Sequence, residues 1–155
     1  MKKAIKVIFS MSFIVYLFVL AMLLFLNRAG STWSTGLSLL ETIRFNSNFI
    51  PFKTIITYIQ AMFDGSMNAD IPIKNLFGNL FMFLPMGIYL PFFINKANKV
   101  RTFIALMTIV LLLIETIQLI SRRGSFDIDD FILNMIGALI GFGIWRLKVV
   151  QRILG

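Results

Sequence analysis

The sequence contains no cysteine and no histidine, and its seven acidic residues are outnumbered by 15 basic ones. Without these side chains the protein cannot form a disulfide, use a thiol nucleophile or a Ser-His-Asp triad, or bind zinc through His and Cys ligands. Any acid–base chemistry would have to use carboxylates, lysine, tyrosine or bound water.

Charged residues of both signs are also scarce. They make up 14% of the chain, hydrophobic residues make up 58%, and the mean hydropathy is +0.86. A soluble domain is about half apolar and about a quarter charged, so this composition indicates a membrane protein, with residues 1–155 forming one domain. The net charge of +8 does not indicate a nucleic-acid partner, because the basic residues flank apolar segments instead of forming a stripe on a polar face.

Four segments are long and apolar enough to cross a bilayer, which takes about 20 residues. These segments are residues 5–26, 76–94, 102–120 and 131–147. The sequence therefore predicts an all-α membrane protein with four transmembrane helices. The first segment could instead be a signal peptide, but its apolar run is longer than a usual signal core and 27–29 is a poor cleavage site. We expect it to be retained.

Local features modify this prediction. Pro85 should kink the second segment, since proline removes a helix hydrogen bond. Gly137 and Gly141 form a GxxxG stretch, which more often permits close helix packing than ligand binding. The long outer loop, 27–75, carries an amphipathic stretch at 54–63 that could lie in the membrane interface. The loop could also cap the bundle through its aromatic residues, and the two interpretations are compatible.

Basic residues predict the orientation, since cytoplasmic loops carry an excess of lysine and arginine. With the N-terminus inside, nine basic residues lie on the inner side and six on the outer side. The hairpin at 96–101 is the densest inner group. The sequence therefore predicts a multi-pass membrane protein with both termini in the cytoplasm.

Polar residues gather at the outer ends of the segments. Glu115 lies five residues before the end of the third segment, while Asn79 and Asn134 lie about 5 Å below the starts of the second and fourth at 1.5 Å per residue. Glu115, Gln118 and Arg122 share one helix face by their spacing. Ionisable residues in a membrane segment usually face a bundle interior or a wet cavity, which predicts a polar pocket open to the outer leaflet.

The run at 127–130 contributes three further carboxylates. Asp127 and Asp130 share a helix face with Asn134, whereas Asp129 is turned away, so we expect Asp129 to matter less. One of the outer two could instead be a helix N-cap. The amides of Asn79, Gln118 and Asn134 could bridge helices, and Glu115 could pair with a nearby arginine.

These same residues resemble the VanZ-like family, the teicoplanin-resistance family of bacterial membrane proteins. The matching stretches, which cover about residues 44–145, are Arg44 with Asn48-x-x-Pro51-Phe52, Asn79 before Phe83-x-Pro85-x-Gly87, Glu115-x-x-Gln118, and Arg123 before Asp127-x-x-Asp130-x-x-x-Asn134-x-x-Gly137. Phe49 stands where leucine is commoner. The resemblance implies a multi-spanning protein of the bacterial plasma membrane, linked in some members to lower susceptibility to teicoplanin-type glycopeptides.

We expect the pocket to bind an envelope or lipid head group, with no cofactor and no metal. Its expected residues are Arg44, Asn48, Asn79, Glu115, Gln118, Arg123, Asp127, Asp130 and Asn134. Arginines, including Arg122, would bind phosphates or sugars, amides would supply neutral hydrogen bonds, and carboxylates would bind hydroxyl or ammonium groups. One alternative is an enzyme acting on a lipid-linked substrate, with Mg²⁺ or Mn²⁺ held by the Asp127–Asp130 run. The other is an interaction protein whose polar residues only hold the bundle together.

Overall fold

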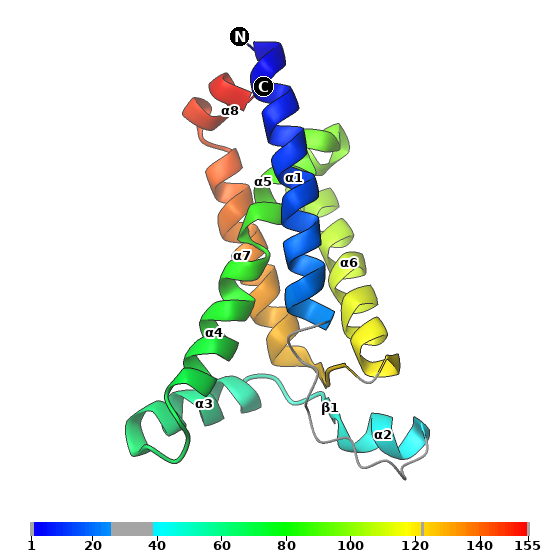
Figure 1. The fold of residues 1–155 in the computed structure, drawn as a ribbon, viewed down its shortest axis with the longest axis vertical. Helices are drawn as coiled ribbons and strands as arrows, with labels where there is room; N and C mark the ends of the chain where they lie inside the picture. The colour runs from blue at the N-terminus through cyan, green and yellow to red at the C-terminus, as the bar shows by residue number, and fades with distance from the viewer. Residues whose placement is uncertain (1, 26–38, 122, 155) are drawn as a thin grey trace.

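The computed structural model describes residues 2–25, 39–121 and 123–154, and it is almost entirely helical (Figure 1). The helices are α1 (Lys2–Phe25), α2 (Leu39–Phe45), α3 (Lys53–Asp64), α4 (Asp70–Met82), α5 (Leu84–Phe93), the 3-10 turn η1 (Asn95–Asn98), α6 (Val100–Ile120), α7 (Ile128–Trp145) and α8 (Lys148–Leu154). Four of the segments have the length and hydropathy of membrane spans: α1, α4 with α5, α6, and α7. The predicted all-α membrane fold is confirmed.

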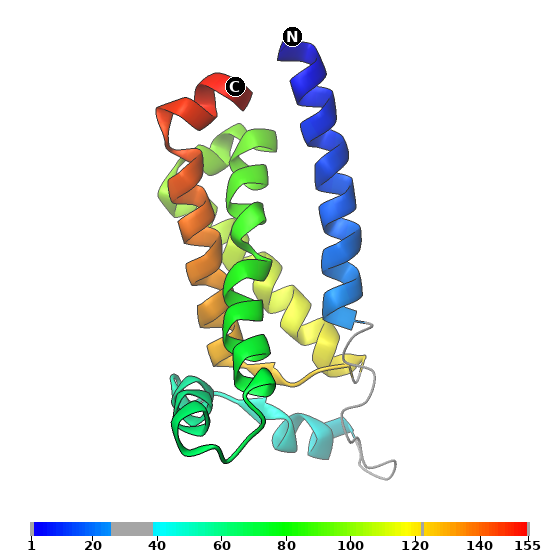
Figure 2. The same cartoon turned by 60° about the vertical axis from the view of Figure 1, so that its left-hand side comes forward.

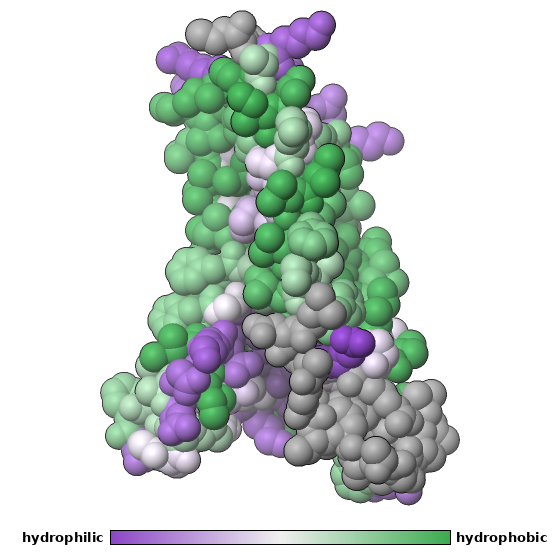
Figure 3. Space-filling view, in the orientation of Figure 1, coloured by the Kyte–Doolittle hydropathy of each residue, from purple (hydrophilic) through white to green (hydrophobic). Residues whose placement is uncertain are grey.

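The spans run side by side along the long axis of the molecule. Both termini lie at one end, which we call the terminal end, together with η1 and α8 (Figures 1 and 2). The opposite end carries α2 and α3 and the connection from α6 to α7, and we call it the loop end. Between them the visible surface is mostly apolar, and hydrophilic side chains gather at both ends (Figure 3). Such an apolar band matches the hydrocarbon core of a bilayer.

Helix α7 is the central element, because it packs against α4, α5 and α6. Its glycines explain the close approach. A Cβ atom on Gly137 would collide with the backbone carbonyl of Leu80, and one on Gly141 would collide with that of Leu84. Gly87 on α5 fits against the backbone of α7 in the same way. The GxxxG stretch therefore serves close packing, as the sequence predicts.

The second span is interrupted at Phe83, where α4 ends and α5 begins. Pro85 lies in the first turn of α5 and has no N–H to bond the preceding turn. The helix is therefore interrupted beside Pro85, as expected from the sequence. The Tyr16 hydroxyl on α1 donates to the carbonyl oxygen of Met82, just before the break, at 3.0 Å. A carbonyl near a helix break in lipid needs such a partner. The span also begins six residues earlier than expected, at Asp70.

Helix α1 joins the bundle through side chains. Phe9 and Phe13 place their rings 4.6 Å and 4.9 Å from that of Tyr89 on α5, and Ser12 shares a hydrogen bond with the Tyr89 hydroxyl at 2.9 Å. Leu20 and Leu24 are buried in the common core. The first segment is therefore packed with the other three spans.

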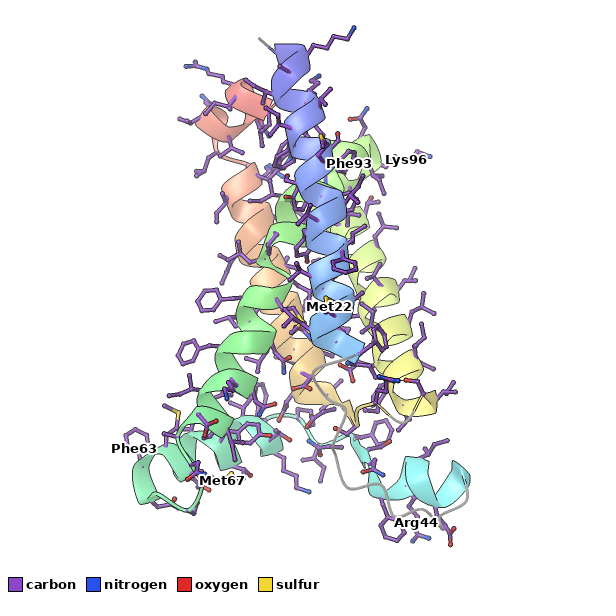
Figure 4. All side chains as sticks on the ribbon, in the orientation of Figure 1. Met22, Arg44, Phe63, Met67, Phe93 and Lys96 are labelled. Atoms are coloured by element: carbon purple, nitrogen blue, oxygen red, sulfur yellow. The ribbon has the colours of Figure 1, made fainter. Side chains whose placement is uncertain are left out.

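The loop end holds the amphipathic segment as α3, which lies across the bundle axis (Figures 1 and 2). Its buried residue is Ala61, whereas Ile56, Ile59 and Phe63 are exposed on an apolar face. Phe63 lies at the tip furthest from the bundle (Figure 4). The helix predicted at 54–63 is thus present, and its position in a membrane interface stays a prediction.

One feature was not expected from the sequence. Two short strands, β1 (Ser47–Asn48) and β2 (Phe126–Asp127), pair in parallel, with Ser47 opposite Phe126 and Asn48 opposite Asp127. This bridge fixes the middle of the long outer loop against the start of α7, and it positions the residues described next.

Candidate ligand-binding site

Polar side chains form a buried group at the loop end, which we call the polar cluster. Each member is less than nine percent exposed, although most lie on or beside spanning helices. The members are Asn79, Glu115, Gln118, Asp127, Asp129, Asp130 and Asn134. Contacts link the spans here, because Asn79 on α4 bonds Asp130 on α7 and Glu115 on α6 bonds the backbone of Asp127.

Asp127 is the N-cap of α7. Its side chain accepts a hydrogen bond from the backbone N–H of Asp129 at 2.9 Å, the usual role of aspartate at a helix start. It also accepts from Asn48 Nδ2 at 3.1 Å and from the Thr54 hydroxyl at 2.7 Å. Asp127 therefore joins α7 to the outer loop, and the capping alternative left open by the sequence applies to this residue.

Asp129 binds the free backbone N–H groups at the N-terminus of α3. It is fully buried and accepts three backbone N–H groups, from Phe52 at 2.5 Å, Thr54 at 2.7 Å and Ile55 at 3.1 Å. These are free N–H groups at a helix N-terminus, where a carboxylate is also favoured by the helix dipole. The expectation that Asp129 matters least is therefore not supported for the fold, because its side chain faces α3 and not solvent.

The backbone around this contact is unusual. Phe52, which precedes α3, has a φ of 66°, and among the described residues other than glycine it alone has a positive φ. A bulky residue rarely adopts this left-handed conformation. Here it directs the Phe52 N–H toward Asp129 Oδ1. The Pro51-Phe52 pair thus shapes the loop that the two aspartates hold.

Asp130 faces the other way, toward the second span. Asn79 on α4 donates its side-chain amide to Asp130 Oδ1. One helical turn further into the bundle, Asn134 Oδ1 is buried and has no hydrogen-bond partner among the described residues. A buried acceptor without a donor is uncommon in folded proteins and requires an explanation.

The third span contributes Glu115 and Gln118. Glu115 Oε2 lies 3.4 Å from the backbone nitrogen of Asp127, which donates to it. Gln118 Nε2 donates to the carbonyl oxygen of Leu24 at 2.9 Å. Arg123, just after α6, donates to the carbonyl of Phe25 at 2.8 Å. Gln118 and Arg123 thus bind carbonyl groups in the last turn of α1.

One expected member of the site, Arg44, lies elsewhere in the structure. Arg44 is exposed on α2, away from the polar cluster (Figure 4), because the short helix α2 leaves the bundle at its edge. Arg122 lies outside the described residues. Asn48 belongs to the rim of the cluster through its bond to Asp127. The basic side chain that the structure brings beside the cluster is Arg123.

The cluster is more closed than expected. Its side chains are buried within the described part of the chain, so they do not line an open outward-facing pocket there. The positions of the carboxylates also do not support the alternative of a Mg²⁺ or Mn²⁺ site at residues 127–130. Among residues 2–25, 39–121 and 123–154, no three acidic side chains lie close enough together to hold a metal ion. Asp127 and Asp129 instead accept hydrogen bonds from the protein.

Thr54 and Asp129 are site residues that the sequence did not identify. Thr54 donates its hydroxyl to Asp127 and its N–H to Asp129, so it links the two carboxylates. Thr54 is the first residue of the amphipathic stretch, where threonine is a common helix N-cap. In the structure α3 begins one residue earlier, at Lys53. The partners of Thr54, however, are more than 70 residues away, which only the fold reveals.

Comparison with protein families gives one match, to the VanZ/LLP1 family, over residues 13–150. The chain belongs to this family. The match covers the second half of the first span, the other three spans and the whole polar cluster, so the resemblance found at the four sequence motifs is confirmed. Comparison with curated proteins and with solved structures found no match.

Proposed function

We propose that this VanZ-family membrane protein binds the head group of an envelope or membrane lipid at the polar cluster. The observation that carries the proposal is the buried, unpartnered Oδ1 of Asn134, one helical turn from Asp130 in a group of buried acidic side chains. Such a group is rich in acceptors, so it suits a ligand that brings hydroxyl or ammonium donors. Ionisable side chains are costly in a membrane span and commonly serve function.

We divide the cluster into a structural part and a ligand side. Asp127, Asp129 and Gln118 are engaged with backbone groups or the outer loop, which supports a role in holding the helices together. Asn134, with its unpartnered Oδ1, would form the ligand side together with Asp130, Asn79 and Glu115, although Asp130 and Glu115 also accept hydrogen bonds within the protein. Arg123 at the rim would meet a phosphate.

The proposal can be tested by adding phosphatidylglycerol or phosphatidylethanolamine to the purified protein and measuring binding. These lipids carry a phosphate together with hydroxyl groups or an ammonium group. We expect one of them to bind the native protein and Glu115→Gln to bind it about tenfold or more weakly, since a hydrogen bond to a charged group is worth roughly 1.5–3 kcal/mol. Native mass spectrometry measures both affinities.

Glu41→Gln is the matched control, because Glu41 is exposed on α2, away from the cluster. We expect it to bind as the native protein does. Equal binding by Glu115→Gln and the native protein would contradict the proposal. Loss of folded Glu115→Gln would instead favour the interaction-protein alternative, in which the cluster only holds the bundle together.

The family also suggests a cellular consequence. A protein that binds an envelope lipid head group would alter how glycopeptides reach their target, so we propose that expression in a susceptible bacterium lowers susceptibility to teicoplanin. The minimum inhibitory concentration measures this effect, and Glu115→Gln at equal membrane abundance should abolish it.

A further inference from the structure

A groove lies between the loop-end part of α1 and the first half of the second span. Its cavity has a volume of about 620 Å³, within the range of about 300–1,000 Å³ typical of small-molecule sites. Leu23 of α1 forms one wall, and Ile73, Phe77, Phe81 and Met82 of α4 form most of the other. The groove is thus apolar along most of its length and belongs to two membrane spans.

The groove opens sideways, toward the position of lipid. Phe77 and Phe81 are 47% and 58% exposed although they lie on a spanning helix. Gly78 leaves part of the wall without a side chain, and a Cβ atom added there would meet no other atom within 4 Å. An apolar, laterally open groove of this kind fits a hydrocarbon chain better than a water-soluble ligand.

Polar groups lie at one end of the groove and on its inner side. Lys74 and Asn75 line it near the start of α4. The Lys74 ammonium is paired with Asp70 at 2.8 Å, but both side chains are more than half exposed, and exposed pairs of this kind hold weakly. Lys74 can therefore turn to a phosphate at little cost. Asn79 also lines the groove, and it contacts Asp130 in the polar cluster.

We propose that this groove holds an acyl chain of an anionic phospholipid, which enters from the membrane between α1 and α4. The phosphate lies beside Lys74, and the head group points inward to Asn79 and Asp130. The inference rests on the proposed function and adds the ligand class, a membrane-embedded phospholipid, and the entry route. It explains why one cavity joins the apolar surface of a span to a buried polar cluster.

A large side chain at Gly78 should fill the groove without disturbing the packing around it. We expect Gly78→Phe to weaken binding of dioleoyl phosphatidylglycerol about tenfold or more, because the chain loses its apolar contacts. Binding of dihexanoyl phosphatidylglycerol, whose chains are short, should change little. Native mass spectrometry of the full-length protein in detergent measures both.

Gly143→Phe is the matched control. A Cβ atom added at Gly143 would also meet no other atom within 4 Å, but this residue lies on α7 toward the terminal end, outside the groove. Leu23→Trp fills the groove from the α1 wall and repeats the test if Gly78→Phe does not fold. Both groove variants should discriminate against the long-chain lipid, while Gly143→Phe should bind it as the native protein does.

The outcomes separate the two proposals. If Glu115→Gln loses both lipids while the groove variants keep full affinity for the long-chain one, the groove inference is overturned and the head-group site stands. If the native protein binds neither lipid, the proposed function fails and the inference fails with it. Loss of only the long-chain lipid in the groove variants supports both.

Discussion

Asp127, Asp129 and Asp130 follow one another closely in the chain, yet they hold different parts of the fold, although Asp127 and Asp129 both bind Thr54. Asp127 caps its own helix and holds Asn48, Asp129 binds the N-terminus of α3, and Asp130 binds Asn79 on α4. Successive helical residues point in directions about 100° apart, since a turn takes 3.6 residues. A short acidic run can therefore join three parts of the fold without forming one ion site.

This division gives a prediction for Asp129. Replacing it with alanine leaves three buried backbone N–H groups without their acceptor, so we expect Asp129→Ala to lower the free energy of unfolding by about 2–3 kcal/mol. Thermal unfolding in detergent measures the loss. Asp64→Ala is the control, because Asp64 also accepts a backbone N–H, from Ser66, but in an exposed turn. Similar unfolding temperatures for the two variants would refute the assigned role.

At the scale of elements, the contact between α7 and the second span depends on small residues. Apolar side chains gain little by leaving lipid for a helix interface, so helices in membranes associate through close packing and hydrogen bonds. Gly137, Gly141 and Gly87 allow that packing. The Asn79–Asp130 contact adds a polar link at the same interface.

Two glycines on α7 make this claim testable with one type of substitution. A methyl group at Gly141 would collide with the backbone of Leu84, whereas a methyl group at Gly143 would meet nothing within 4 Å. We expect Gly141→Ala to destabilise the protein by about 1–3 kcal/mol through overpacking. Gly143→Ala should be neutral or stabilising, since alanine favours helix by about 1 kcal/mol over glycine. Thermal unfolding of both variants measures the difference in stability. A Gly141→Ala protein as stable as the native protein would disprove the close contact.

At the scale of the whole molecule, four spans bring both termini to one end and α2, α3 and the polar cluster to the other (Figure 1). The distribution of basic residues predicts that the terminal end is cytoplasmic. The cluster would then belong to the outer half of the membrane. This placement would put the proposed head-group site in the outer leaflet.

Cysteine labelling tests the orientation directly, since the native chain has no cysteine to remove. We expect an impermeant thiol reagent to label Ser66→Cys and Ser125→Cys in intact cells, because both positions are exposed at the loop end. Lys96→Cys is exposed at the terminal end and should react only after the membrane is opened (Figure 4). Labelling of Lys96→Cys in intact cells would reverse the predicted topology.

The sequence by itself determined the membrane class, the four spans and the break near Pro85, and the rise per residue predicted the depth of Glu115, Asn79 and Asn134. These features follow from local rules: apolar length, proline chemistry and rise per residue act within one segment. The family motifs likewise named most members of the polar cluster, and they did so without any knowledge of contacts.

Only the tertiary structure decided what each polar residue binds. Asp129 had no visible partner in the sequence, because the N–H groups that it accepts lie 74 to 77 residues away. Arg44 was grouped with the cluster by its motif, yet α2 carries it away. The groove between α1 and α4 depends on how two spans meet, which no pattern within either span records. Hydrophobic length selects the helices, whereas hydrogen bonds between distant segments select their partners, and those bonds exist only once the chain has folded.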